Sequence, residues 1–284
     1  MPPSEHPDTN LREGALAALR LTDPADKAAA AHALWQRLEG LADDDARTEA
    51  LSPTRVIALP DGTELPGRPA QPRLVAPSAV PQRSPFTPEG LAALLHAVCH
   101  IEFNAINLAL DAVWRFACMP PDFYRDWLRV ADEEATHFGL LREHLQSLGH
   151  DYGDCPAHNG LWEMCVKTQH DITARMALVP RTLEARGLDA TPLIQQRLRQ
   201  VGTPAALRAV AILDIILRDE IGHVAIGNRW YAWLCAREGL EPVAHYRLLA
   251  RTHGAPRLRP PFNDAARRQA GFSQAEIEYL LGAA

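Results

Sequence analysis

The chain has 284 residues, of which 47% are hydrophobic and 23% are charged, so it can form a packed core and is not a disordered chain. Its 35 acidic residues outnumber 29 basic ones and give a net charge of -6, which argues against a general binder of nucleic acids or anionic membranes. The five cysteines form no Cys-x-x-Cys pair, so neither a disulfide framework nor a thiolate zinc site is predicted. Because no signal peptide and no run of about 18 apolar residues is present, we expect a soluble cytoplasmic protein.

Residues 1–86 form the first predicted region. A short helix is expected near residues 11–20 and a longer one from 24 to 40, where Asp23 can cap the helix and Pro24 suits its first position. The stretch 66–85 then has too many prolines for a helix or a central strand. It is predicted to be either an extended strap over a domain surface or a loose linker.

From residue 87 onward the pattern changes to long segments with helical periodicity. Prolines after threonine open the first and fourth of these helices, and Gly187 is expected to stop the third. The predicted helices cover residues 87–118, 122–147, 160–186 and 204–238. Four long helices predict an all-α protein with a four-helix bundle over residues 87–240.

The remaining residues, 241–284, are expected to form a C-terminal extension of shorter helices. One of these begins at Ser273, which has Glu276 three positions later, the spacing of a capping box.

The spacing Glu-x-x-His occurs twice, as Glu134 with His137 and as Glu220 with His223. Residues three apart share one face of a helix, and both pairs fall in the middle of long predicted helices. Two such pairs alone are a weak signal in a chain of this composition. About thirty residues upstream of each pair lies another glutamate, Glu102 or Glu184, so each of the four helices provides one.

Glu102 lies on an otherwise apolar helical stripe, where a buried carboxylate needs a compensating partner. Four converging carboxylates would repel one another in a low-dielectric interior, so they would become protonated or bind metal. Two helices giving Glu and two giving Glu-x-x-His form the ligand set of carboxylate-bridged di-iron or di-manganese bundles. The predicted metal ligands are Glu102, Glu134, His137, Glu184, Glu220 and His223. Glu184 is the weakest member because Pro180 and Gly187 favour a kink in its helix.

Five stretches carry a family resemblance: "HIEFNAINLALDA" at 100–112, "EEATHF" at 133–138, "YGDCPAHNGLWE" at 152–163, "ALVPRTLEARGLDATP" at 177–192 and "RDEIGHVAIGNRW" at 218–230. Through them the chain resembles the ferritin-like proteins of domain-of-unknown-function family 455, over nearly its whole length. The resemblance implies a ferritin-like bundle with a non-haem di-iron centre held by the same six residues. More distantly, the pattern is similar to that of the di-iron tRNA hydroxylases and other ferritin-like oxygenases. The family itself has no assigned reaction.

We therefore expect an enzyme in which two iron ions, with manganese as the alternative metal, use O2 to oxidise or hydroxylate an unidentified small-molecule substrate. Iron handling of the ferroxidase or storage type, a tRNA-modifying hydroxylase and a metal-free helical interaction module are the alternatives. No catalytic residue is identified. Neither a membrane nor general nucleic-acid binding is expected, and a homodimer is left open.

Several other polar residues have both a functional and a structural interpretation. Four of them could orient a ligand side chain or take part in ordinary packing and surface ion pairs: His96, His100, Asp132 and Asp219. His170 and Asp171 either line the cavity or lie on the surface. The arginines of residues 245–270 could recognise phosphate or pair with the acidic surface.

Overall fold

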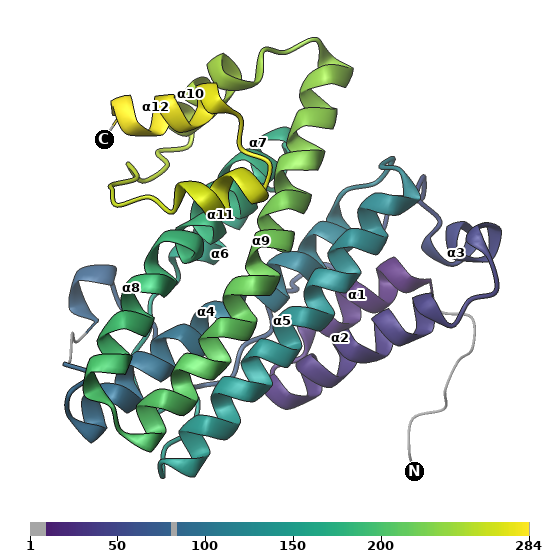
Figure 1. Ribbon diagram of the computed structural model, residues 1–284. Helices are drawn as coiled ribbons and strands as arrows, with labels where there is room; N and C mark the ends of the chain where they lie inside the picture. Colours follow the sequence, from purple (N-terminus) through teal and green to yellow (C-terminus); the bar gives the residue numbers. More distant parts are fainter. Residues whose placement is uncertain (1–9, 81–83, 284) are drawn as a thin grey trace, which may run out of the picture. The chain divides into compact units, whose positions relative to one another are not determined.

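The computed structural model (Figure 1) describes residues 10–80 and 84–283, and the described residues form helices and loops without a β-strand. The all-α prediction is therefore confirmed. Part of the predicted N-terminal region, residues 1–9 and 81–83, lies outside the described residues. The chain divides into two compact units, one made of Met1–Pro72 with His100–Gly139 and the other of Arg73–Cys99 with Leu140–Ala284.

The first unit contains α1 (Leu11–Arg20), α2 (Pro24–Glu39) and α3 (Asp44–Leu51), together with residues 100–115 of α4 (Pro88–Arg115) and 121–139 of α5 (Pro121–Ser147). The predicted cap of α2 is confirmed, since the Asp23 carboxylate accepts hydrogen bonds from the amides of Ala25 and Asp26. The short helix α3 was not predicted.

Two buried cations tie this unit together. The Arg12 guanidinium donates to the carbonyl oxygens of Val113 and Trp114, which are among the last acceptors of α4 and have no helical donor of their own. The Lys27 ammonium donates to the carbonyl of Leu19 and, through the carbonyl of Gly67, holds the start of the proline-rich stretch against the helices. That part of the stretch is therefore a strap rather than a loose linker.

The second unit contains α6 (Gly160–Lys167), α7 (Ile172–Leu178), the π-helix Val179–Glu184, α8 (Ala185–Val201), α9 (Pro204–Glu238), α10 (Pro242–Thr252), α11 (Asp264–Gln269) and α12 (Gln274–Ala283). It also includes the start of α4, the end of α5 and the 3-10 turn Pro77–Ala79. Helices α8 and α9 pack side by side because only Gly202 and Thr203 separate them (Figure 1). Helices α11 and α12 share a hydrophobic core with α8 and α9.

The prediction for the third long helix was wrong. Instead of one helix from 160 to 186, the chain forms α6, a break at 168–171 and then α7, whose first turn is capped by the Asp171 carboxylate. The expected stop at Gly187 is also wrong, because Gly187 lies inside α8. The helix continues through it because Ala185 and Leu188, on either side, are fully buried in the core.

A π-helix, Val179–Glu184, interrupts this region and ends at Glu184. Pro180 has no N–H to donate, and in a regular α-helix its ring would clash with a carbonyl of the preceding turn. A regular α-helix is therefore disfavoured at this point. The Thr182 hydroxyl instead donates to the Ala177 carbonyl at 2.7 Å. The sequence prediction of a kink near Glu184 is therefore confirmed, although it takes the form of a π-helix.

Helix α4 is long and apolar enough to cross a membrane by the criteria of length and composition, with a window of mean hydropathy 1.3. Within the structure 72% of that window is buried, and a mostly buried core helix of a soluble protein meets the same criteria.

Candidate metal centre

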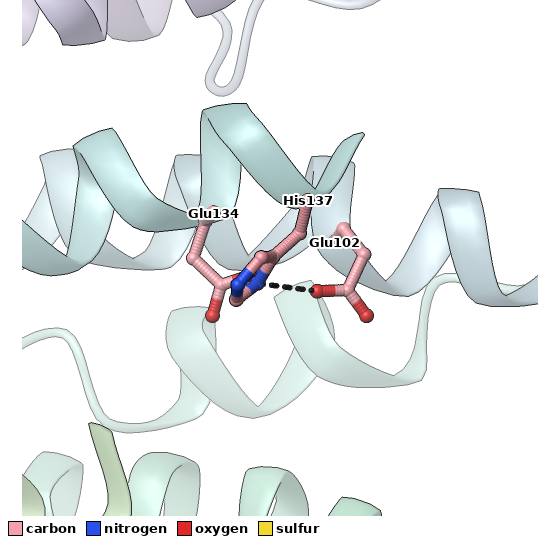
Figure 2. A group of neighbouring side chains, drawn as sticks. All are labelled: Glu102, Glu134 and His137. Atoms are coloured by element: carbon pink, nitrogen blue, oxygen red, sulfur yellow. Dashed lines mark ion pairs between the residues drawn. The ribbon is translucent and has the colours of Figure 1, made fainter. Parts of the chain in front are cut away.

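Three of the six predicted ligands meet in the first unit. Glu134 and His137 lie one helical turn apart on α5, and Glu102 faces them from α4 (Figure 2). The His137 Nδ1 atom is 3.3 Å from a carboxylate oxygen of Glu102 and 3.4 Å from one of Glu134. One ligand atom from each residue lies within 4.8 Å of the others. These separations would allow a single ion to bind all three side chains.

Apolar packing fixes this arrangement. Phe103 follows Glu102 and Phe138 follows His137, and their rings pack with centroids 5.4 Å apart. Both rings are buried, and Ala135 on α5 is buried as well. This ring contact joins α4 to α5 at the level of the ligands, which lowers the cost of holding the two helices in one geometry.

Burial makes the charges of this cluster costly. Glu134 and His137 are completely buried and Glu102 is 3% exposed. Burial alone would lower the pKa of His137, but the carboxylates of Glu102 and Glu134 favour the imidazolium more strongly and raise its pKa to about 11. The three groups by themselves then carry two negative charges and one positive charge. A divalent cation that displaced the imidazolium proton would bring them to neutrality, and carboxylate with imidazole is a donor set that iron and manganese accept.

The second Glu-x-x-His pair lies on α9 in the second unit. The His223 ring is completely buried, Glu220 is 8% exposed, and His223 Nδ1 is 3.9 Å from Glu220 Oε1. The pair therefore shares one face of a helix, as the spacing predicted. The α9 pair therefore offers the same two kinds of donor atom as the α5 pair, an imidazole nitrogen and a carboxylate oxygen.

Glu184, the sixth predicted ligand, is the last residue of the π-helix and is 7% exposed. Its side chain is therefore buried and does not lie on the surface. Among the described residues, Glu184, Glu220 and His223 do not form a cluster as tight as that of Glu102, Glu134 and His137.

The structure shows the following contacts of the remaining sequence candidates. His96 accepts a hydrogen bond from the Gly153 amide and stacks on Tyr152, so it holds the loop after α5. Asp132 bonds the ring of His32 at 2.6 Å, and Asp219 pairs with the adjacent Arg218. The side-chain NH2 of Asn104 donates to His100 Nε2 at 3.0 Å and to the His100 carbonyl at 2.8 Å, within α4.

Two further candidates, His170 and Asp171, are exposed. Asp171 caps α7, so it has a structural role in the start of that helix.

Two buried basic residues were not predicted from the sequence, Lys27 and Arg181. Lys27 lies on the buried face of α2 with Ala31 and Leu34. It is fully buried, with Nζ 5.1 Å from the Phe103 ring centroid and 2.5 Å from Asn107 Oδ1. Burial lowers its pKa to about 7. A charged residue at a core position was the available signal, the same signal that identified Glu102.

Comparisons with known proteins identify a family but no activity. The family model described as protein of unknown function (DUF455) matches residues 20–278. An uncharacterized protein of Haemophilus influenzae is 54% identical over 219 residues, which cover 75% of this chain and 75% of that protein. No solved structure matches the chain.

Proposed function

The chain belongs to this family of proteins of unknown function (DUF455), and because the family description assigns no reaction, we propose a function from the site itself. We propose that the protein is a ferritin-like, non-haem di-iron enzyme that uses O2 to oxidise or hydroxylate a small-molecule substrate. Its two metal ions are held by Glu102, Glu134, His137, Glu184, Glu220 and His223.

The observation that carries the proposal is the buried cluster of Glu102, Glu134 and His137. Two carboxylates in a solvent-free interior are expensive unless a cation compensates them. Surface ion pairs and solvated helix faces, the ordinary explanations for Glu and His three residues apart, do not apply to side chains that are 0–3% exposed. The buried repeat on α9 adds a second set of the same donors.

The residues of the chain have definite tasks in this proposal. The carboxylates of Glu102 and Glu134 would hold hard cations, and His137 and His223 would each add a nitrogen donor. His137 must lose its proton to become a ligand, so its carboxylate neighbours also govern when metal can bind. The three ligand side chains are 0–3% exposed, so bulk water is excluded from them. Bound iron would supply the one-electron and O2 chemistry that no side chain provides.

The proposal is tested by metal analysis of protein loaded with Fe(II) without oxygen. We expect about two ions per chain. Glu102→Gln, which keeps the side-chain volume and removes the charge, should lower the occupancy. Glu89→Gln serves as the matched control, because Glu89 lies on the same helix α4 and is exposed.

A stoichiometry well below one ion per folded wild-type chain would exclude the di-metal centre. Equal iron content in Glu102→Gln and Glu89→Gln would show that the bound iron lies elsewhere. Oxygen consumption by the loaded protein, measured with the oxygen electrode, separates an enzyme from a metal-free helical interaction module.

A further inference from the structure

The π-helix Val179–Glu184 sets the direction of the Glu184 side chain at its end. A π turn contains one residue more than an α turn, so every later side chain is rotated by roughly 100° relative to a continuous α-helix. Glu184, the last residue of the π-helix, is 7% exposed. A shift of this segment to α-helical geometry would turn its carboxylate away from its present direction.

Such a turn is less stable than a regular α-helix and needs support from its surroundings. Part of this support comes from α9, where Gly227 leaves room for the ring of Pro180. A Cβ at position 227 would lie 2.6 Å from Pro180 Cβ. A second contact is the Thr182 hydroxyl, which donates to the Ala177 carbonyl and accepts at 3.0 Å from the Tyr246 hydroxyl of α10.

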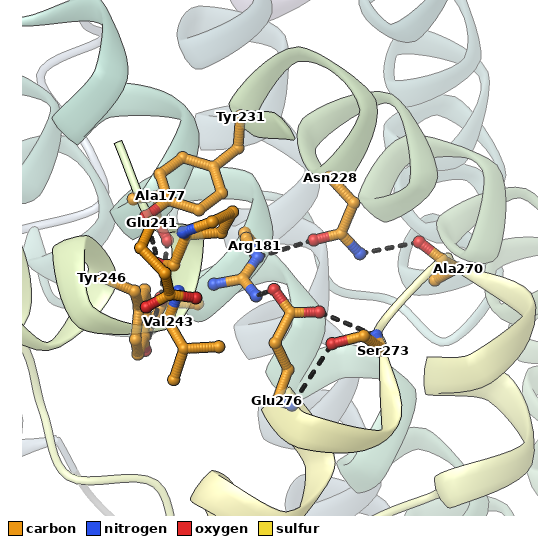
Figure 3. A network of polar contacts seen from close by, with 12 residues as sticks. Ala177, Arg181, Asn228, Tyr231, Glu241, Val243, Tyr246, Ala270, Ser273 and Glu276 are labelled. Carbon is orange, nitrogen blue, oxygen red and sulfur yellow. Dashed lines mark hydrogen bonds and ion pairs between the residues drawn. The ribbon is translucent and has the colours of Figure 1, made fainter. Parts of the chain in front are cut away.

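Arg181 provides the largest set of contacts (Figure 3). Its side chain is 4% exposed, and its Nε donates to Asn228 Oδ1 at 2.8 Å, while Nη2 donates to the carboxylate of Glu276 on α12. The guanidinium carbon lies 4.9 Å from the centroids of both Tyr231 and Tyr246. Arg181 is thereby fixed by side chains from α9, α10 and α12.

The C-terminal helices are ordered by the same contacts. Glu276 accepts from the Ser273 amide at 2.7 Å and forms the predicted capping box of α12, so one carboxylate both starts the helix and binds Arg181. Farther along α8, the buried Arg267 of α11 pairs with Asp189 at 2.6 Å. The C-terminal extension is thus attached to the segments on both sides of Glu184.

We propose that Arg181, held by Glu276, is a positioning residue that maintains the π-helix and thereby directs the Glu184 carboxylate toward metal. This role of the C-terminal extension rests on the proposed function, because it assumes that Glu184 is a ligand. Arg181 itself touches no reacting atom; it acts on the backbone three residues before Glu184.

Glu276→Gln is the sharpest test. Glutamine can still accept the Ser273 amide in a capping box, so α12 keeps its start, while the charge that holds Arg181 is lost. Arg181 and Glu276 also line a cavity of about 320 Å³, so water can solvate the released guanidinium and the variant should fold. Arg181→Lys and Arg181→Met form a second pair, in which only the lysine keeps the charge. The matched control is Glu278→Gln, an exposed carboxylate on the same helix.

Two measurements are needed. In metal-free protein, hydrogen exchange followed by mass spectrometry should show amides of residues 179–184 exchanging about tenfold faster or more in Glu276→Gln than in wild type, as expected for loss of a charge-assisted hydrogen bond. Titration with Co(II), followed by its visible absorption, should show one of the ions bound about 10- to 100-fold more weakly. Arg181→Lys should lie between wild type and Arg181→Met in both measurements.

Wild-type exchange and wild-type Co(II) spectra in Glu276→Gln would overturn the proposal, and so would faster exchange with unchanged Co(II) binding, because the clamp would then be purely structural. If the wild-type protein itself binds no Co(II), the di-metal function fails. In that case, faster exchange of residues 179–184 in Glu276→Gln would still support the role of Arg181 in maintaining the π-helix.

Discussion

At the scale of single residues, the chain places charge in its interior in a few positions, and each position has its own compensation. Arg12 is satisfied by carbonyl oxygens at a helix end, Lys27 by two carbonyls and an amide oxygen, and Arg181 by a carboxylate and aromatic rings. The cluster of Glu102, Glu134 and His137 differs because acidic groups outnumber the histidine. A bound cation is the compensation that this composition favours.

Glu184→Gln separates a ligand from a structural carboxylate. The substitution keeps volume and helical propensity and removes the charge that attracts a hard cation, so metal content or O2 consumption should fall. The stability of the metal-free protein should hold or rise, because one buried negative charge is removed. Metal analysis and thermal unfolding check this, with Glu163→Gln, an exposed site on α6, as control. Normal iron and normal O2 consumption would remove Glu184 from the site.

Lys27 predicts a pH dependence of stability. Burial lowers its pKa from 10.5 to about 7, so between about pH 7 and 10.5 the unfolded chain binds more protons than the folded one. The contribution of Lys27 to the free energy of unfolding should therefore rise with pH in this window, by at most about 1.4 kcal/mol per pH unit. Urea titrations from pH 6.5 to 10 should show this slope in wild type and a flatter one in Lys27→Met.

Lys167→Met provides the control for that experiment. Lys167 is exposed on α6, so its substitution should leave the pH slope unchanged. An equal slope in wild type and Lys27→Met would mean that Lys27 remains protonated in the fold, held by its three oxygen acceptors.

At the scale of the helices, two glycines of α9 offer a direct comparison. A Cβ at position 227 would lie within 2.7 Å of two atoms of the rigid Pro180 ring, whereas a Cβ at Gly222 would have no atom within 4 Å. Gly227→Ala should therefore destabilise the protein by about 1–3 kcal/mol through overpacking. Gly222→Ala should stabilise it by about 0.5–1 kcal/mol, because alanine favours the helix more. Denaturant unfolding measures both, and a neutral Gly227→Ala would contradict the packing of Pro180 against α9.

Local signals explain which helices could be predicted from the sequence. Helix α9 begins after Thr203 and ends before Gly239, as expected, because the Thr203 hydroxyl caps the first turn and Gly239 takes a positive φ of 67°. At Gly187 no such constraint ends the helix, and the burial of the neighbouring Ala185 and Leu188 favours its continuation. Tertiary packing thus overrode a local stop signal.

In the candidate site, too, local sequence signals predict some features and tertiary packing decides others. The periodicity of α4 and α5 was sufficient to place Glu102, Glu134 and His137 on buried helical faces, because this spacing can be read along the chain. The environment of Glu184 could not be predicted in detail. It depends on Gly227 and Tyr246, which are distant in sequence and show their role only after folding.

At the scale of the whole molecule, the arginine-rich tail is less available than its composition suggested. Arg267 is completely buried in an ion pair with Asp189, Arg268 donates to Gln274, and Arg247 stacks over Tyr279 at 4.4 Å. Of these three contacts, the Arg267–Asp189 ion pair is of the predicted kind, in which a tail arginine pairs with an acidic residue. Because the net charge is -6, we still expect no general binding of nucleic acid.

Metal should also stabilise the whole fold, since an ion that binds the native site and not the unfolded chain shifts the unfolding equilibrium by mass action. At a free concentration of about 100 times Kd the gain is about 2.7 kcal/mol. For a chain of this size that corresponds to a rise in Tm of roughly 5–10 °C. We expect this rise when Co(II) is added to metal-free wild type under reducing conditions, followed by circular dichroism, and its reversal by a chelator.

The variant Glu134→Gln decides whether that rise comes from the buried cluster. Glu134 is completely buried and lies 3.4 Å from His137, so removing its charge should abolish most of the metal-dependent increase in Tm. Glu143→Gln alters a carboxylate on the same helix whose side chain is 70% exposed, and it should keep the full increase. If Co(II) raised the Tm of Glu134→Gln as much as that of Glu143→Gln, the stabilising ions would be bound by the acidic surface, and the cluster of Glu102, Glu134 and His137 would not be the metal site.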